Sequence, residues 1–288
     1  MKIKTYFSLL FASACTLGLS SCEQDLNQDP DFNFPADEGL EIQLPEPLYH
    51  AEFEDNLSLD GQLGGTMTTF GGVTPQFVNS KREGKAYKNQ EGSALIINPD
   101  VSAIERIKKL GSFSVFMWVN YEGMNPSSCS LFAIGERKNF IGNFSFWIDD
   151  HHAKDDPKEF NFKCYICATG NAGRPDSWFD VGDKGHVPNM ANKWRMVGVT
   201  YDDATATMVL YNQGAEVATK SLNSKLSPLT FSEVTGICLG AQPAMVGLSD
   251  VDSWPKHATF FTGIMDKFYF FGEALDANQV AALYDRTK

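Results

Sequence analysis

Apolar and polar residues alternate along much of the chain, which is the pattern of β-strands that place one face in a core. In segment 159–169, every second residue from Phe160 to Ala168 is apolar or small. Segment 113–121 is apolar on both faces, as expected of a central strand that is covered on both sides. Further strands are predicted at 48–57, 93–97, 130–135, 143–149, 194–202, 236–240 and 259–271, and the turn Asn212-Gln213-Gly214 predicts a hairpin within 205–222.

One clear helix is predicted, and it lies at the end of the chain. Asp276 is a natural N-cap residue, and Gln279 three positions later completes a capping-box pair. Leu275 and Val280 flank this start as a hydrophobic staple. A weaker helical pattern at 102–109 can bridge two strands. Many short strands between turn residues, with a single clear helix, predict an all-β sandwich.

The N-terminal segment has the features of a secretory signal. A short basic start, MKIK, precedes an apolar run that is too short to span a membrane as a mature helix. The run ends in LSSC, which resembles the lipobox of bacterial lipoproteins, where cleavage precedes the cysteine. We therefore predict a signal peptide at 1–21 and a lipid anchor, with acyl chains such as palmitate, on Cys22. The alternative is an ordinary signal peptide with an incidental cysteine.

Residues 22–47 are predicted to form a flexible tether. From residue 23 to 47 the chain holds eight acidic residues and four prolines, and it contains no lysine or arginine. Such a stretch buries little apolar surface and stays extended. Acidic residues close behind a lipidated cysteine also resemble the surface-export signal of Bacteroidetes lipoproteins. We therefore expect an outer-membrane lipoprotein that faces the cell surface, with a periplasm-facing anchor as the alternative.

Composition and charge narrow the function classes further. Hydrophobic residues make up 43% of the chain, which rules out wholesale disorder. The chain has 24 basic against 36 acidic residues and a formal net charge of −12. Such a chain has no basic field to neutralise phosphates, so nucleic acid is excluded as a partner.

Six segments resemble, in order, the signature strands of laminin-G-like domains in the concanavalin A-like lectin and glucanase group. They are 48–61 (LYHAEFEDNLSLDG), 83–97, 113–123, 193–218, 237–243 and 261–285. The resemblance implies a two-sheet antiparallel jelly-roll sandwich with a short C-terminal helix, formed as one domain by residues 48–288. It says little about activity, because functional sites are grafted onto folds.

The resemblance also implies a structural metal site, although no cofactor is required by the sequence. Relatives often hold Ca²⁺ between the opening and closing strands, and the matching positions here are Glu54 and Asp266. Two positions depart from the family pattern: Asp55 replaces the usual glycine, and Lys267 places a positive charge beside the ion.

Catalytic residues are not apparent in the sequence. Glycosidases of this fold class use two carboxylates that flank the glycosidic bond, and same-face carboxylates on a strand need even spacing. The Glu-x-Asp-x-Glu pattern of the laminarinase-like branch is absent from the sequence. Glu52 and Glu54 have the right spacing but lie in the opening strand. We therefore expect no enzyme, with an unrecognised glycoside hydrolase as the alternative.

Four cysteines remain after Cys15 and Cys22 are assigned to the signal and the anchor. Cys164 and Cys167 are three residues apart in a predicted strand, so their side chains point to opposite faces and cannot easily form a bridge. Cys164 is interpreted as a small buried hydrophobic residue. A disulfide among Cys129, Cys164, Cys167 and Cys238 stays open in an exported protein.

Carbohydrate binding is the function that the sequence favours most. Trp178 and Trp254 lie in two segments rich in Gly, Pro and Asp, which are predicted as long loops. If the two rings converge, nearby polar residues can bind sugar hydroxyls; they are Asp176, Asp180, Asp252 and His257. The alternative is that each tryptophan folds back to cap the sandwich.

Three function classes follow from these patterns. The first is a membrane-anchored, non-catalytic glycan-binding or adhesion protein. The second is a hydrolase of the concanavalin A-like class, and the third is a structural envelope protein that uses the sandwich as a scaffold. Exposed tryptophans at one rim favour the first class, whereas two carboxylates facing each other in a cleft favour the second.

Overall fold

The computed structural model describes residues 41–80, 82, 84–122, 128–149, 159–168, 174–188, 190–251 and 258–288. The predicted signal, Cys22 and most of the tether lie outside these ranges, and so do Asp252, Trp254 and His257. Residues Ile42–Lys288 form one compact unit. Within the described part of the chain, neither helix has the length and apolar character needed to cross a membrane.

The first sheet, sheet A, has eight strands. Their order is β14 (Ala215–Ser221), β13 (Thr207–Asn212), β12 (Trp194–Asp202), β6 (Phe113–Tyr121), β16 (Gly263–Phe271), β4 (Lys85–Lys88) and β3 (Gln76–Asn79), and β1 (Tyr49–Ala51) also pairs with β16. The pairs are antiparallel throughout. Its centre, β6 between β12 and β16, is buried at nearly every position, as the two-sided apolar pattern predicts.

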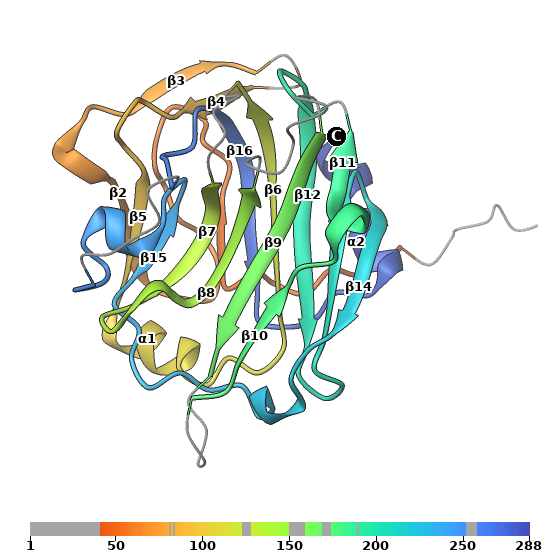
Figure 1. The fold of residues 1–288 in the computed structure, drawn as a ribbon. Coiled ribbons are helices and arrows are strands. Elements are labelled where there is room, and N and C mark those ends of the chain that lie inside the picture. Colours follow the sequence, from red (N-terminus) through yellow and green to blue (C-terminus); the bar gives the residue numbers. More distant parts are fainter. Residues whose placement is uncertain are drawn as a thin grey trace, which may run out of the picture. The chain divides into compact units, whose positions relative to one another are not determined.

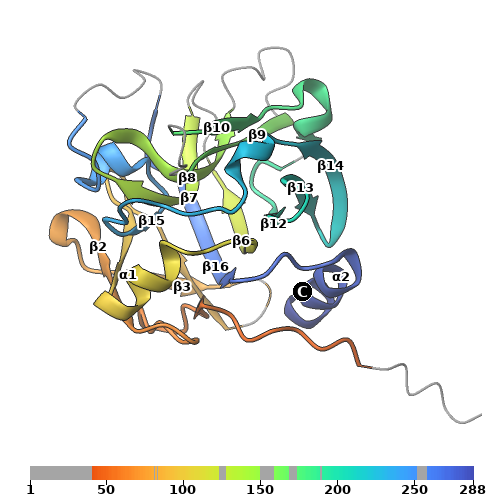
Figure 2. The ribbon, with the colours of Figure 1, turned by 90° about the horizontal axis from the view of Figure 1, so that it is seen from below.

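The second sheet, sheet B, also has eight strands. Their order is β10 (Asp176–Phe179), β9 (Glu159–Cys167), β8 (Asn139–Asp149), β7 (Ser128–Glu136), β15 (Ile237–Leu239), β5 (Leu95–Pro99) and β2 (Gly65–Thr69). The eighth strand, β11 (His186–Pro188), pairs with the start of β9, whereas β10 pairs with its end. These pairs are antiparallel as well. The two sheets lie one on the other as layers (Figures 1 and 2), which confirms the predicted jelly-roll sandwich.

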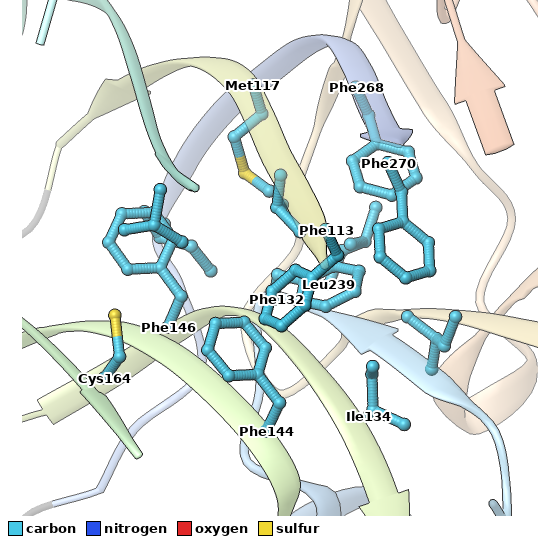
Figure 3. Packing of buried hydrophobic residues seen from close by; sticks show 14 of the residues in the cluster. Phe113, Met117, Phe132, Ile134, Phe144, Phe146, Cys164, Leu239, Phe268 and Phe270 are labelled. Carbon is cyan, nitrogen blue, oxygen red and sulfur yellow. The ribbon is translucent and has the colours of Figure 1, made fainter. Parts of the chain in front are cut away.

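The core between the sheets contains many phenylalanine residues. Phe113 of sheet A meets Phe144 of sheet B with ring centroids 4.8 Å apart, and Phe132 meets Phe270 at 5.2 Å. Figure 3 shows these rings interleaved between the layers with Cys164 beside them. Edge-to-face and tilted pairs of this kind add to the free energy gained from burial. These contacts therefore stabilise the packing of the two sheets against each other.

The C-terminal helix α2 (Ala277–Thr287) forms as predicted. The Asp276 side chain accepts a hydrogen bond from the backbone N–H of Gln279, and the Gln279 side chain accepts one from the backbone N–H of Asp276. Leu275 and Val280 are buried together in the cluster under the helix. The helix packs on the outer face of sheet A, where Trp118 Nε1 donates a hydrogen bond to Thr287 Oγ1 at 2.9 Å. Figure 2 shows α2 outside the layer of β12 and β13.

Local sequence patterns also predicted a hairpin and a second helix. The predicted hairpin joins β13 and β14 through Gln213 and Gly214, both with positive φ, as a two-residue turn requires. The weak helical pattern at 102–109 becomes α1 (Val101–Ile107), which Asp100 caps through the backbone N–H of Ala103.

One expectation about the strands was wrong, and several short strands were not predicted. Trp178 lies on the edge strand β10 rather than in a long loop, because residues 176–179 pair with β9 despite a composition typical of loops. The strands β2, β3 and β4 escaped prediction, because they are only four or five residues long and carry polar or glycine positions.

The four described cysteines are buried and are not bonded to one another: Cys129, Cys164, Cys167 and Cys238. Cys164 packs in the core between the sheets, whereas Cys167 lies on the outer face of sheet B. The two side chains therefore point to opposite faces, as strand geometry predicts. Burial raises the pKa of the Cys164 thiol, which keeps it protonated and inert.

Candidate functional site

The outer face of sheet B carries an aromatic and charged patch that the strand alternation places there. On β8, Phe146 points into the core and its neighbour Trp147 points outward. On β9, Phe162 faces the core, so Lys163 and Tyr165 face outward. Pairing between the strands sets Trp147 opposite Lys163 and sets Tyr165 opposite Trp178 of β10. Three adjacent strands thus bring these side chains to one surface.

A groove with a volume of about 190 Å³ lies on this patch. It is smaller than the ~300–1,000 Å³ typical of pockets for drug-sized ligands, so it offers a short contact surface rather than an enclosed cavity. Its described lining combines aromatic, aliphatic and polar side chains: Ser128, Phe140, Ile141, Trp147, Asp149, Lys163, Trp178, Asp180, Gln242 and Ala258.

Trp178 is the exposed aromatic residue in the described lining of the groove. Its side chain is 45% exposed, and it is the one aromatic residue of the described chain that is exposed to this degree. Its ring lies 5.8 Å from that of Trp147 at an angle of 86°, and 4.9 Å from that of Tyr165. These two neighbours are almost fully buried, so they hold Trp178 in place while part of its ring stays in solvent.

The charged part of the lining is an ion cluster centred on Lys163. Its Nζ lies 2.9 Å from Asp149 Oδ2 and 2.9 Å from Asp180 Oδ2. Burial alone would lower the pKa of Lys163, but the hydrogen bonds to Asp180 and Asp149 outweigh burial and raise it. For Asp180 burial would raise the pKa, but the hydrogen bonds from Lys163 and the backbone N–H of Gly182 lower it. Both groups therefore stay ionised at neutral pH.

Backbone contacts fix this edge of the sheet. Lys220 of β14, in sheet A, donates through Nζ to the carbonyl oxygens of Trp178 (2.8 Å) and Asp180 (3.1 Å). Asp176, at the other end of β10, accepts a hydrogen bond from the Tyr165 hydroxyl at 3.2 Å. The groove is thus built on paired strands and braced from the opposite sheet, which favours a preformed site.

Three of the six predicted ligand-binding residues come together here: Trp178 and Asp180 line the groove, and Asp176 lies beside them. The other three, Asp252, Trp254 and His257, lie outside the described residues, so the convergence of the two tryptophans stays a prediction.

Sequence reasoning missed Trp147, Lys163 and Tyr165. Trp147 lies in the predicted strand 143–149, where it shares strand parity with Ser145 and Asp149 rather than with Phe146. That parity is a signal that the sequence carries. Which face of the strand is the outer one becomes evident only when both sheets are placed.

The predicted calcium residues have other partners. Arg82 Nη1 lies 3.4 Å from Asp266 Oδ2, and its guanidinium stacks 3.5 Å above the centre of the Trp118 ring. Glu54 accepts a hydrogen bond from the backbone N–H of Lys85 at 2.8 Å. Within the described ranges, no group of three or more His, Cys, Asp or Glu side chains is arranged to hold a metal ion. As folded, this pair does not fit a shared calcium ion, because Arg82 already supplies the positive charge next to Asp266.

Comparison with known proteins assigns the fold to a family. The Laminin_G_3 family model, described as the concanavalin A-like lectin/glucanases superfamily, matches residues 99–281, so the chain belongs to this family. This confirms the laminin-G-like resemblance for the part of the chain that the family model covers. No curated protein matches the chain significantly.

Several solved structures with this fold are binding domains of botulinum neurotoxins. The serotype C1 binding domain has a TM-score of 0.57 at 14% identity, over 84% of this chain and 52% of that chain. The serotype D/C domain in complex with SialylT has a TM-score of 0.52 at 13% identity, over 84% and 52%. A third, described by the dependence of type C cell entry on two ganglioside molecules, has a TM-score of 0.53 at 13% identity, over 84% and 51%. This chain spans about half of those chains, and at such identity the likeness shows the fold alone.

Proposed function

We propose that this protein is a non-catalytic glycan-binding or adhesion module, anchored to the outer membrane through Cys22 and displayed at the cell surface. The observation that carries the binding role is the half-exposed Trp178 beside the ion cluster of Lys163. The lectin family and the SialylT and ganglioside ligands of the neurotoxin domains support a sugar as the ligand class. The anchor and the surface location rest on the LSSC motif and the acidic tether.

The chemistry of the groove suits a sugar ring. Sugars have apolar C–H faces that stack on aromatic rings, and hydroxyl groups that need both donors and acceptors. Trp178 offers the ring, and the Asp180 side chain, which is 43% exposed, offers acceptor oxygens. Lys163 has three N–H donors, of which two are directed at Asp149 and Asp180. The third can donate to a sugar oxygen.

Hydrolysis is the second candidate, because Asp149 and Asp180 both reach one lysine and therefore lie near each other. A glycosidase needs one carboxylic acid with a raised pKa to protonate the leaving oxygen. The pKa of Asp180 is lowered by Lys163 despite burial, so Asp180 is a poor proton donor at neutral pH. The same lysine lies between the two carboxylates. This arrangement favours binding over bond cleavage.

The experiment is truncation of the exposed ring. Trp178→Ala should weaken the best glycan found on an array by about tenfold, because a stacked aromatic contact contributes ~0.5–1.5 kcal/mol beyond area burial and ~1.4 kcal/mol is tenfold. Trp178→Phe keeps an aromatic face and should retain most of the affinity. Val101→Ala, at a residue that is 80% exposed on α1, is the matched surface control.

Thermal unfolding of the same variants separates binding from structure. Trp178 is half-exposed, so its truncation should cost clearly less than the ~3–5 kcal/mol of a buried tryptophan. An unchanged glycan affinity together with a large loss of stability would reject the binding role and leave Trp178 as a packing residue.

A further inference from the structure

Strand β10, which carries Trp178, is the last strand on its side of sheet B. It pairs with β9 along one edge, where the carbonyl oxygen of Pro175 accepts from the backbone N–H of Ala168 at 2.9 Å. Successive carbonyl groups along a strand point to opposite edges, so those of Asp176 and Trp178 point away from β9. No other strand of the described chain pairs with this second edge. The strand that carries the exposed ring therefore needs support from elsewhere.

Lys220 supplies part of that support from the opposite sheet. In the pairing of β13 with β14, Lys220 lies opposite Met208, whose side chain is in the core. The register therefore places Lys220 on the inward-facing side of sheet A, where a charged residue is unusual. Because β14 is the edge strand of sheet A, this long side chain reaches the edge of sheet B. There its Nζ donates to the carbonyl oxygens of Trp178 at 2.8 Å and Asp180 at 3.1 Å.

Asn223 extends this contact along the strand. Its side-chain amide donates to the carbonyl oxygen of Asp176 at 3.3 Å, and its backbone N–H donates to Ser177 Oγ at 3.3 Å. We call Lys220 and Asn223 the β10 clamp. Neither residue is among the described residues that line the groove. The clamp therefore contacts the strand behind the binding surface rather than the surface itself.

The charge of Lys220 also acts on the groove. Burial would raise the pKa of Asp180, but the hydrogen bonds from Lys163 and the backbone N–H of Gly182 lower it, and the positive charges of Lys163 and Lys220 add to the lowering. Lys220 thus favours the ionised form of the carboxylate that is proposed to accept from a sugar hydroxyl. Hydrogen bonding and charge are two separate ways in which Lys220 can affect binding, and they need separate variants.

We infer that the β10 clamp positions Trp178 for sugar binding without touching the sugar. The inference rests on the proposed glycan-binding function and adds two positioning residues to it. Without the clamp, β10 would sample positions in which the Trp178 ring does not meet the sugar face. The apparent dissociation constant is the intrinsic one divided by the binding-competent fraction, so a smaller fraction weakens binding in proportion.

The main variant is Lys220→Met, which keeps most of the side-chain length but removes the N–H donors and the charge. It should weaken binding of the best array glycan by about three- to tenfold, the scale of one lost hydrogen bond. Lys220→Arg keeps charged N–H donors and should retain most of the affinity. An arginine variant as weak as the methionine variant would assign the loss to packing of the lysine stem and overturn the inference.

Lys225→Met is the matched charge control. Lys225 is exposed in the short turn Ser224–Leu226, which follows the clamp in the chain. Its replacement removes the same charge as Lys220→Met and should leave the affinity unchanged. An equal loss in both variants would assign the effect to the net charge of the protein and overturn the inference.

Asn223→Ser tests the clamp without a change of charge. Asn223 Oδ1 also accepts from the backbone N–H of Lys225 at 3.1 Å, and serine keeps a side-chain acceptor for it. Serine lacks the amide N–H that reaches Asp176, so binding of the same glycan should weaken by about two- to threefold. An unchanged affinity would overturn the role of Asn223. This variant also carries the test if Lys220→Met does not fold.

Hydrogen exchange measures the clamp in the absence of sugar. Lys220→Met should speed the exchange of the backbone N–H groups of 176–180 several-fold, whereas 143–149 of β8 should stay protected. Faster exchange with unchanged affinity would make the clamp a purely structural contact. Weaker affinity with unchanged exchange would assign the loss to the charge of Lys220. Either result overturns the inference.

Other outcomes separate the inference from the proposed function. If Trp178→Ala weakens glycan binding and Lys220→Met does not, the glycan-binding function stands and the positioning inference is wrong. If the wild-type protein binds no glycan on the array, the proposed function fails, and the positioning role fails with it.

Discussion

Replacing Asp266 by asparagine tests how a buried charge is tolerated in sheet A. Asp266 is fully buried on β16, and its one described ionic partner is Arg82 at 3.4 Å. Burial raises the pKa of Asp266 from 3.8 to about 7, although the positive charge of Arg82 acts in the opposite direction. The folded protein therefore keeps this proton to a much higher pH than the unfolded chain does.

The sign and size of the effect follow from linkage. Between pH 4 and pH 7 the unfolded chain releases the Asp266 proton and the folded protein retains it, so the free energy of unfolding falls as the pH rises. At ~1.36 kcal/mol per pKa unit, the full shift corresponds to a loss on the order of 4 kcal/mol, complete above the folded pKa. Asparagine cannot titrate, so Asp266→Asn should lack this loss.

The assay is urea unfolding of the wild type and of Asp266→Asn at pH values from 4 to 8. The difference in unfolding free energy, variant minus wild type, should rise across this range, because only the wild type is destabilised. Asp285→Asn, at an exposed residue of α2, should give a flat difference. A difference that falls with pH would refute the reasoning, because it would mean that the ion pair with Arg82 outweighs burial and that Asp266 is ionised in the folded state.

The same site tests the calcium hypothesis. If Glu54 and Asp266 shared a calcium ion, added Ca²⁺ would raise the melting temperature and a chelator would lower it. Because Arg82 already faces Asp266, we expect neither change. A chelator-sensitive melting temperature would restore the calcium site that the family resemblance implies.

Two further predictions concern the helix and the anchor. Leu283→Ala should destabilise the protein by ~2–5 kcal/mol, because the Leu283 side chain of α2 is buried against the sheet. Asp276→Ala removes the helix cap and should cost ~0.5–2 kcal/mol. Equal and negligible shifts of both variants in thermal unfolding would mean that α2 does not pack on the sheet. Cys22→Ala should move the protein from the membrane to the soluble fraction, and palmitate labelling of that variant would contradict the predicted lipobox.

Short-range patterns determined what the sequence could predict. The cap of α2 and the turn at Gln213-Gly214 involve residues within a few positions of each other, so the sequence predicted both. β10 was not, because its four residues become a strand only by pairing with β9. A tertiary contact overrode the local loop composition around Trp178.

The candidate site was readable only in part for a related reason. Trp178, Asp176 and Asp180 stood out because their segment is polar and glycine-rich, whereas Trp147 and Lys163 belong to strands that read as core. Alternation divides each strand into two faces, but it does not say which face is covered by the other sheet. Lys163 on β9 reaches Asp149 on the neighbouring β8 and Asp180, which directly follows β10, so this cluster exists only in the assembled sheet.

The two outer faces of the sandwich set Trp178 apart from the other described tryptophans. On sheet A, α2 covers the outer aromatic residues, and Trp118 is 3% exposed between Arg82 and the helix. On sheet B, Trp147 is nearly as buried, yet Trp178 beside it is left 45% exposed next to the charged residues of the groove. The neighbours of Trp178 are buried and hold its ring in place, but part of the ring stays in water. Covering that apolar surface with a ligand would therefore be favourable. A sugar face on Trp178 would cover that surface, which is why the binding proposal rests on this residue.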